Sequence, residues 1–238
     1  MSRKYSIQFK CHFDLTLYPF DSQHCYMKLR VSGSTSDYIG FNRNSTARYN
    51  GSEVRDVLLM EYSVGETTLS VDNKEEFAAL KVKLELIRRS GYAILNIYTP
   101  SLTLIIISYV TLFFRADMFE VRVMSALTAL LVLATIFTQV SAALPKTSYF
   151  KMVDIWLLFC IILTFVIIIW HTVLDILHNQ PKALMVAAIG DNKVRPSGMS
   201  NNWTKQKSRA EKAVTYSHTS VVVIFLIFNM AYWFYILV

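Results

Sequence analysis

The chain has 238 residues, of which 53% are hydrophobic and only 17% are charged, and its mean hydropathy is +0.35. One soluble core of this size cannot hide so much apolar surface, so the composition indicates a membrane protein. The net charge of +7 does not require a nucleic-acid partner, because basic loops beside membrane spans account for it.

The first 90 residues are predicted to form β-structure. Their candidate strands are short, rich in β-branched, aromatic or alternating apolar residues, and separated by clusters of Gly, Asn, Ser and Asp. These segments are Tyr5–Cys11, Cys25–Ser32, Val54–Tyr62 and Leu80–Ile87. Antiparallel hairpins are the simplest way to pair them.

Cys11 and Cys25 enclose thirteen residues that contain Tyr18-Pro19-Phe20-Asp21, and Gln23 lies two places further on. This pattern resembles the signature loop of the pentameric Cys-loop ligand-gated ion channels, and the resemblance runs from about residue 5 to the C-terminus. It implies that residues 1–90 are part of an extracellular ligand-binding β-sandwich. An oxidising outer compartment favours a Cys11–Cys25 disulfide over free thiols or a metal site.

The start of the chain, Met1-Ser2-Arg3-Lys4, carries no signal peptide, and the strands that open the sandwich in the family have no counterpart. Half a sandwich would leave exposed strand edges and an uncovered apolar face. We therefore expect an N-terminally truncated form of a longer subunit, whether a splice form, a partial gene model or an engineered piece.

Agonist recognition in this family uses a box of aromatic side chains at subunit interfaces. Residues 27–34, where one such ring is expected, contain none, and the short acidic segment Ser70–Phe77 has Phe77 alone. A small amine is therefore a poor candidate, and a proton or a metal ion is an alternative. The residues that would titrate or ligate are His12, His24, Asp72, Glu75 and Glu76. Their spacing specifies no metal site, so solvated surface groups remain the simpler interpretation.

Coupling between the outer domain and the pore is implied by the resemblance at three places. These are Pro19, Phe20 and Asp21 of the disulfide loop, Arg88 and Arg89 before the first span, and Pro145 and Lys146 after the second. Arginines at this depth can pair with carboxylates of the loops, while Phe20 packs among helix ends. Arg88 as a lipid headgroup anchor is an equal alternative.

Four apolar segments are long enough to cross a bilayer, and they give the second domain, residues 91–238. The predicted spans are 92–114, 122–144, 152–174 and 219–238, and Pro100 is expected to kink the first. The basic segment 175–218 is predicted to be a cytoplasmic loop, which makes the N-terminus extracellular in a multi-pass plasma-membrane protein. The sequons at Asn44 and Asn50 agree with that orientation. The fold class is therefore membrane α+β, a partial antiparallel sandwich followed by a four-helix bundle.

The second span carries the predicted pore face. Steps of three and four residues place hydroxyls and an amide on one stripe with a leucine in the middle. The stripe is Met124, Thr128, Leu131, Thr135, Thr138, Gln139 and Ala142. A five-fold ring of such helices would line a water-filled pore. The leucines would form a hydrophobic constriction that closes the pore by excluding water. Alternatively, the hydroxyls merely bond their own backbone or a neighbouring helix.

Ion selectivity is predicted from Phe119-Glu120-Val121-Arg122 at the inner mouth. Rings of Arg favour anions and rings of carboxylates favour cations. The segment Ser148–Trp156 resembles the anion branch, especially arthropod chloride channels, so chloride is favoured. The alternatives are cation selectivity through Glu120, and an Arg122 that is only an interfacial anchor.

The sequence contains no phosphate-binding loop, no strong metal-ligand spacing and no nucleophile with a recognisable base, so we expect no enzyme activity and no cofactor. The prediction is a subunit of a pentameric chloride channel whose partners are the bilayer, other channel subunits and a small extracellular agonist, proton or metal ion. A non-conducting regulatory subunit that joins full-length partners is the alternative from another class.

Overall fold

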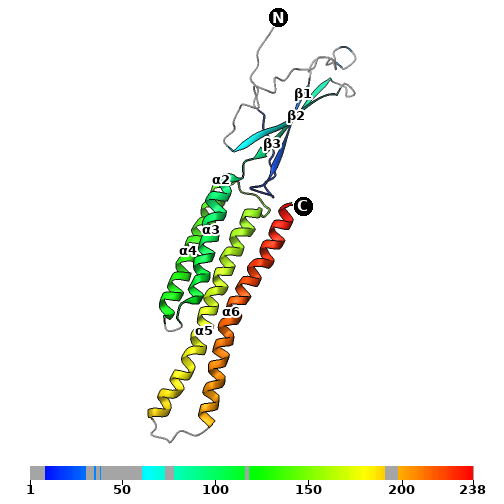
Figure 1. Ribbon diagram of the computed structural model, residues 1–238. Coiled ribbons are helices and arrows are strands. Elements are labelled where there is room, and N and C mark those ends of the chain that lie inside the picture. The colour runs from blue at the N-terminus through cyan, green and yellow to red at the C-terminus, as the bar shows by residue number, and fades with distance from the viewer. Residues whose placement is uncertain are drawn as a thin grey trace. The chain divides into compact units, whose positions relative to one another are not determined.

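The computed structural model describes residues 9–30, 35, 38, 61–72, 78–115, 118–190 and 198–237, with the backbone alone at residues 72, 179–190 and 198–210. The chain divides into two compact units, Met1–Tyr92 and Ala93–Val238. The first contains a three-stranded antiparallel sheet and the second four long apolar helical segments (Figure 1). The predicted fold class is thereby confirmed.

The sheet has the order β1-β3-β2, with β1 over Ser22–Arg30, β2 over Tyr62–Asp72 and β3 over Ala79–Arg88. Both neighbours run antiparallel to the central strand β3, and Cys25 lies opposite Leu84. Along the first part of β1, buried and exposed residues alternate, as expected for a strand with one covered face.

Two of the four predicted strands correspond to observed ones, because β1 overlaps Cys25–Ser32 and β3 contains Leu80–Ile87. Of Tyr5–Cys11, the described residues 9–11 form no strand, and nearly all of Val54–Tyr62 lies outside the described residues. Strand β2 was not predicted. Its irregularity between Val64 and Thr67 interrupts the apolar alternation that identifies a strand.

The first span is built from several helical types: α2 (Gly91–Ala93), η1 (Ile94–Tyr98), α3 (Thr99–Val110) and η2 (Thr111–Phe113). The π-helical turn η1 lies directly before Pro100, which has no N–H to donate. The backbone N–H and the hydroxyl of Thr99 both bond the carbonyl of Ile94. The irregularity of this span is therefore a π turn whose carbonyl is satisfied locally.

The other spans belong to α4 (Phe119–Ala143), α5 (Met152–Gly190) and α6 (Gly198–Leu237). The last two continue beyond the predicted spans, and Figure 1 shows them extending past α3 and α4. The predicted loop 175–218 is thus largely helical, and residues 191–197 lie outside the described part. Residues 182–189 are mostly good helix formers, which favours the continuation of α5 beyond its span, and the cytoplasmic location of residues 175–218 stays a prediction.

Within the described part of the chain, four helical segments are long and apolar enough to cross a membrane: Gly91–Phe113, Phe119–Ala143, Met152–His178 and Glu211–Leu237. Helix α5 is central, because it packs against α3, α4 and α6. Its most apolar window is 44% buried, whereas that of α6 is 11% buried. The core therefore follows α5, and α6 lies at the edge of the bundle.

Candidate functional site

The predicted pore stripe is the outward face of α4. All seven of its residues are exposed, with Leu131 68% exposed in the middle. The opposite face packs against the rest of the bundle, and its buried residues are Arg122, Ala126, Ala129 and Leu133. The two alanines let the neighbouring helices approach closely. Nothing within this chain covers the stripe among the residues that the structure describes.

The stripe hydroxyls donate to the backbone of their own helix. Thr128 Oγ1 bonds Met124 O at 2.7 Å, Thr135 bonds Val132 O at 2.7 Å and Thr138 bonds Thr135 O at 2.8 Å. Such bonds to the helix's own backbone are those that we expected if the hydroxyls have only a structural role. The hydroxyl oxygens remain on the exposed face, where their lone pairs can accept from water or contact a cation.

The charged residues at the start of α4 lie on opposite faces. Arg122 is 2% exposed and nine residues before Leu131, which at about 100° per residue puts it about 180° from the stripe. Glu120 is exposed and eleven residues before Leu131, about 20° away. Within this chain, Arg122 therefore lies on the packed face of α4 and Glu120 on the exposed face, and the role of each residue in selectivity stays a prediction. Val121 is 51% exposed.

Arg122 belongs to a polar cluster, here called the basic end, which also contains the buried Thr111 and His171 and the half-buried Asp175 and His218. Its Nε has no hydrogen-bond partner among the described residues, although the charge of Asp175 acts on it. His171 is 0% exposed, and its Nε2 lies 2.7 Å from the hydroxyl of Thr111. His218 packs against the ring of Phe113 at 4.4 Å. This cluster was not predicted from the sequence, although polar residues within apolar spans could have indicated it.

At the other end of the bundle, here called the aromatic end, the polar atoms of Tyr98, Trp156 and Tyr232 all have hydrogen-bond partners. The hydroxyls of Tyr98 and Tyr232 are 2.6 Å apart, and Tyr232 also bonds Met152 O at 3.2 Å. Trp156 Nε1 donates to Ser101 Oγ at 2.9 Å. These bonds join the first, third and fourth spans with their polar atoms satisfied.

In the first unit, Cys11 and Cys25 form the predicted disulfide, with Cα atoms 5.5 Å apart. The enclosed loop contains a cis Tyr18–Pro19 bond. Gln23 is 3% exposed and fastens the loop, since its Oε1 accepts from Asp14 N at 2.9 Å and its Nε2 donates to both Asp14 O and Asp21 Oδ2. The side chain at position 23 is thus a structural part of the loop.

Arg88 is enclosed by partners. It forms an ion pair with Asp21 at 2.6 Å, a second with Glu61 at 3.4 Å, and a hydrogen bond with the hydroxyl of Tyr62. Its guanidinium also lies 4.8 Å from the ring centroid of Tyr18 and 4.4 Å from that of Tyr62. Burial alone would lower the Arg88 pKa, but the hydrogen bond and charge of Asp21 raise it overall. Arg88 therefore stays charged.

The remaining coupling residues are placed more simply. Pro19 is buried and Phe20 is half-buried in the loop, Arg89 is exposed, and its N–H donates to Glu61 O at 2.9 Å. Pro145 and Lys146 are exposed in the segment after α4. Their role in coupling stays a prediction.

Few of the predicted agonist residues lie within the described part. His12 and His24 are exposed, the side chain of Asp72 is not described, and Glu75 and Glu76 lie outside the described residues, as do the sequons at Asn44 and Asn50. Within the described ranges, no three His, Cys, Asp or Glu side chains are grouped as a metal site would require.

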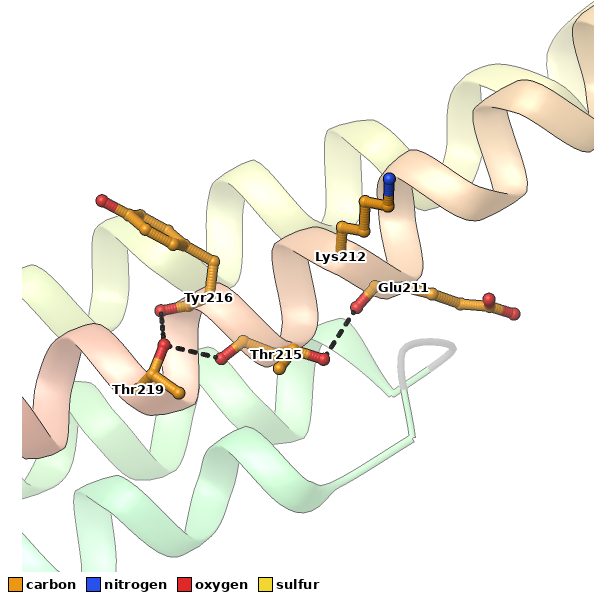
Figure 2. A pocket seen from close by; sticks show the side chains of 5 residues that line it. All are labelled: Glu211, Lys212, Thr215, Tyr216 and Thr219. Atoms are coloured by element: carbon orange, nitrogen blue, oxygen red, sulfur yellow. Dashed lines mark hydrogen bonds between the residues drawn. The ribbon is translucent and has the colours of Figure 1, made fainter.

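A hollow of about 430 Å³ lies on one side of α6 (Figure 2). It is lined by Glu211, Lys212, Thr215, Tyr216 and Thr219. The two threonine hydroxyls donate to carbonyls of their own helix, as the dashed lines in Figure 2 show. One acidic and one basic side chain give it no net charge, so we assign it no ligand. Tyr216 packs edge-on against Trp170 at 5.7 Å, an aromatic pair suited to a membrane interface.

Residues 97–189 match the family model for the neurotransmitter-gated ion-channel transmembrane region. This part of the chain is therefore similar to the transmembrane region of Cys-loop channel subunits. The matched family is one of ion channels and not of enzymes. The chain is also 28% identical over 186 residues to the glycine receptor subunit beta of Rattus norvegicus, Mus musculus and Homo sapiens.

The similarity to those receptor subunits covers 76% of this chain but only 37–38% of theirs. The chain thus spans well under half the length of the curated relatives it matches. The resemblance to Cys-loop channels is supported at this level, whereas the finer resemblance to arthropod chloride channels stays a prediction.

Proposed function

We propose that the chain is a subunit of a pentameric, extracellular ligand-gated ion channel of the plasma membrane, in which α4 of each subunit lines the pore. The exposed stripe on α4 carries this proposal. Thr128, Thr135, Thr138 and Gln139 would face hydrocarbon in an isolated subunit, where polar groups are costly. A ring of subunits instead gives them water.

Leu131 is the proposed gate, because a ring of exposed leucines midway along a polar face forms a constriction that excludes water. The basic segment 175–218 supports a cytoplasmic location for that end and an extracellular N-terminus. Oligomerisation with other channel subunits follows from the same geometry.

The test compares Leu131→Ser with Leu133→Ser in cells that express the chain behind a secretory signal peptide. Leu131→Ser should produce current without agonist, since a hydroxyl in the constriction lets water in. Leu133 is 0% exposed on the packed face, so Leu133→Ser should lower the yield of folded channel without opening it. Current from the Leu133 variant alone would contradict the assigned pore face.

For the permeant ion we propose chloride, supported by the resemblance of Ser148–Trp156 to the anion branch of the family. The geometry favours a second candidate, a cation channel. Glu120 is exposed on the Leu131 side, Arg122 is turned away, and the stripe threonines present acceptor oxygens.

The reversal potential of the Leu131→Ser channel separates the two candidates when external chloride is replaced by a large impermeant anion. A shift that follows the chloride gradient supports chloride. A potential that follows sodium, and that is altered by Glu120→Gln but not by Arg122→Gln, supports the cation channel. Surface protein that carries no current, alone or with a conducting partner, would favour the non-conducting regulatory subunit.

A further inference from the structure

The basic end of the bundle combines titratable groups from every element that meets there. Helix α4 supplies Arg122, α5 supplies His171 and Asp175 with His178 seven residues beyond His171, and α6 supplies His218. The first span contributes the Tyr109 ring, which contacts His218 edge-on at 5.8 Å, and the Thr111 hydroxyl. Arg122 acts electrostatically on both His171 and His218.

The hydrogen bonds of Thr111 define the protonation of His171. The Thr111 hydroxyl lies 2.6 Å from Ser108 O and must donate there, because a carbonyl oxygen only accepts. The same hydroxyl oxygen, 2.7 Å from His171 Nε2, must therefore accept the Nε2–H. Neutral His171 is thus the Nε2–H tautomer, and its Nδ1 carries a lone pair.

That lone pair is buried and has no hydrogen-bond partner among the described residues. A proton bound there would create a second positive charge beside Arg122, at a site that is 0% exposed at His171 and 2% exposed at Arg122. Asp175 is the carboxylate whose charge acts on Arg122, and it already faces that cation. The packed bundle therefore accepts this proton less readily than a loosened bundle does, so acid favours the loosened form.

The direction of the movement follows from the placement of Arg122. Its side chain points from α4 toward the bundle, about 180° from Leu131. Repulsion between His171 on α5 and Arg122 therefore moves the inner end of α4 toward its exposed stripe. In a ring of subunits, that movement narrows the inner mouth.

We propose that Nδ1 of His171 is a proton-binding site through which acid on the cytoplasmic side reduces the channel current. The effect on current rests on the proposed function, whereas proton binding at the site does not. Both parts have separate measurements.

The binding measurement is ¹⁵N NMR of the histidine rings in the chain reconstituted in nanodiscs. On titration from about pH 8 to about pH 3, the His171 spectrum should change from the Nε2–H tautomer to the doubly protonated ring. Thr111→Val removes the acceptor and should convert the neutral ring to a mixture of tautomers. The His171 signals, assigned by their loss in His171→Gln, overturn the proposal if they stay unchanged over this range.

The electrical measurement uses inside-out patches of the Leu131→Ser channel. Lowering the bath from about pH 7.5 to about pH 4 should reduce the current at least about twofold. His171→Gln keeps a donor for Thr111 but binds no proton, so its current should be insensitive. Arg122→Gln should reduce the sensitivity, and His178→Gln should leave it unchanged.

Acid sensitivity in His171→Gln equal to that of the parent channel overturns the proposal. If neither channel conducts, the proposed function fails, and the NMR titration still decides whether the proton site exists.

Discussion

Two buried arginines, Arg88 beside the disulfide loop and Arg122 at the basic end, are treated differently by their surroundings. The side chain of Arg88 is 9% exposed and has two carboxylates, a hydroxyl and two aromatic rings around it. Arg122 is 2% exposed, and its Nε lacks a hydrogen-bond partner among the described residues. Arg88, whose guanidinium has partners on several sides, stabilises the contact between the disulfide loop and the strands. Arg122, whose Nε has no such partner, can respond to a change in nearby charge.

Removing the charge partner of Arg88 should have the largest effect. Asp21→Asn leaves a buried cation without its main counter-charge and should lower the free energy of unfolding by about 3–5 kcal/mol. Glu61→Gln is the matched control, because Glu61 is 74% exposed at 3.4 Å and its loss should cost at most about 1 kcal/mol. Thermal unfolding of the purified protein measures both variants. Equal losses of unfolding free energy would contradict the assignment of Asp21 as the main partner of Arg88.

Replacing the arginines themselves by methionine sharpens the comparison. Arg88→Met leaves Asp21 unpaired and should destabilise the protein strongly, by about 3 kcal/mol or more. Arg122→Met removes a buried cation whose Nε has no hydrogen-bond partner among the described residues, so the unfolding free energy should change by less than about 1 kcal/mol or rise. The same unfolding measurement compares them. A loss of unfolding free energy in Arg122→Met larger than that in Arg88→Met would show that the partners of Arg122 stabilise the fold.

The smallest effect concerns the tyrosines around Arg88. Burial raises the pKa of Tyr18 and Tyr62, although the charge of Arg88 opposes it. Both rings are held neutral in the folded chain, so stability is retained below about pH 10 and declines as the pH rises through the raised values. Tyrosinate absorbance should show a late-ionising fraction that is smaller in Tyr62→Phe and absent after unfolding.

Much of this arrangement was predictable because its signals are local. The spacing of Cys11 and Cys25 and the uncharged apolar runs identify the disulfide loop and the spans without any tertiary information. The orientation of Arg122 was also within reach, since counting nine residues to Leu131 places it on the far side of the helix.

Other features required the folded chain. Strand β2 was missed because the irregularity between Val64 and Thr67 breaks the two-residue period. The contact between Thr111 and His171 joins residues sixty positions apart, and no pattern in a single sequence specifies such a pair. The saturated shell of Arg88 likewise depends on β3 meeting the loop and β2 at one point.

The edge position of α6 makes the bilayer its main solvent. Only 11% of its apolar window is buried in protein, and in lipid no hydrophobic force drives a helix against its neighbours. Its attachment therefore rests on a few contacts, such as Phe159 stacked on Phe228 at 3.6 Å and the hydrogen bonds of the Tyr232 hydroxyl. The thickness and composition of the membrane should thus act on α6 before they act on the other spans, so the choice of lipid becomes part of the description of this fold.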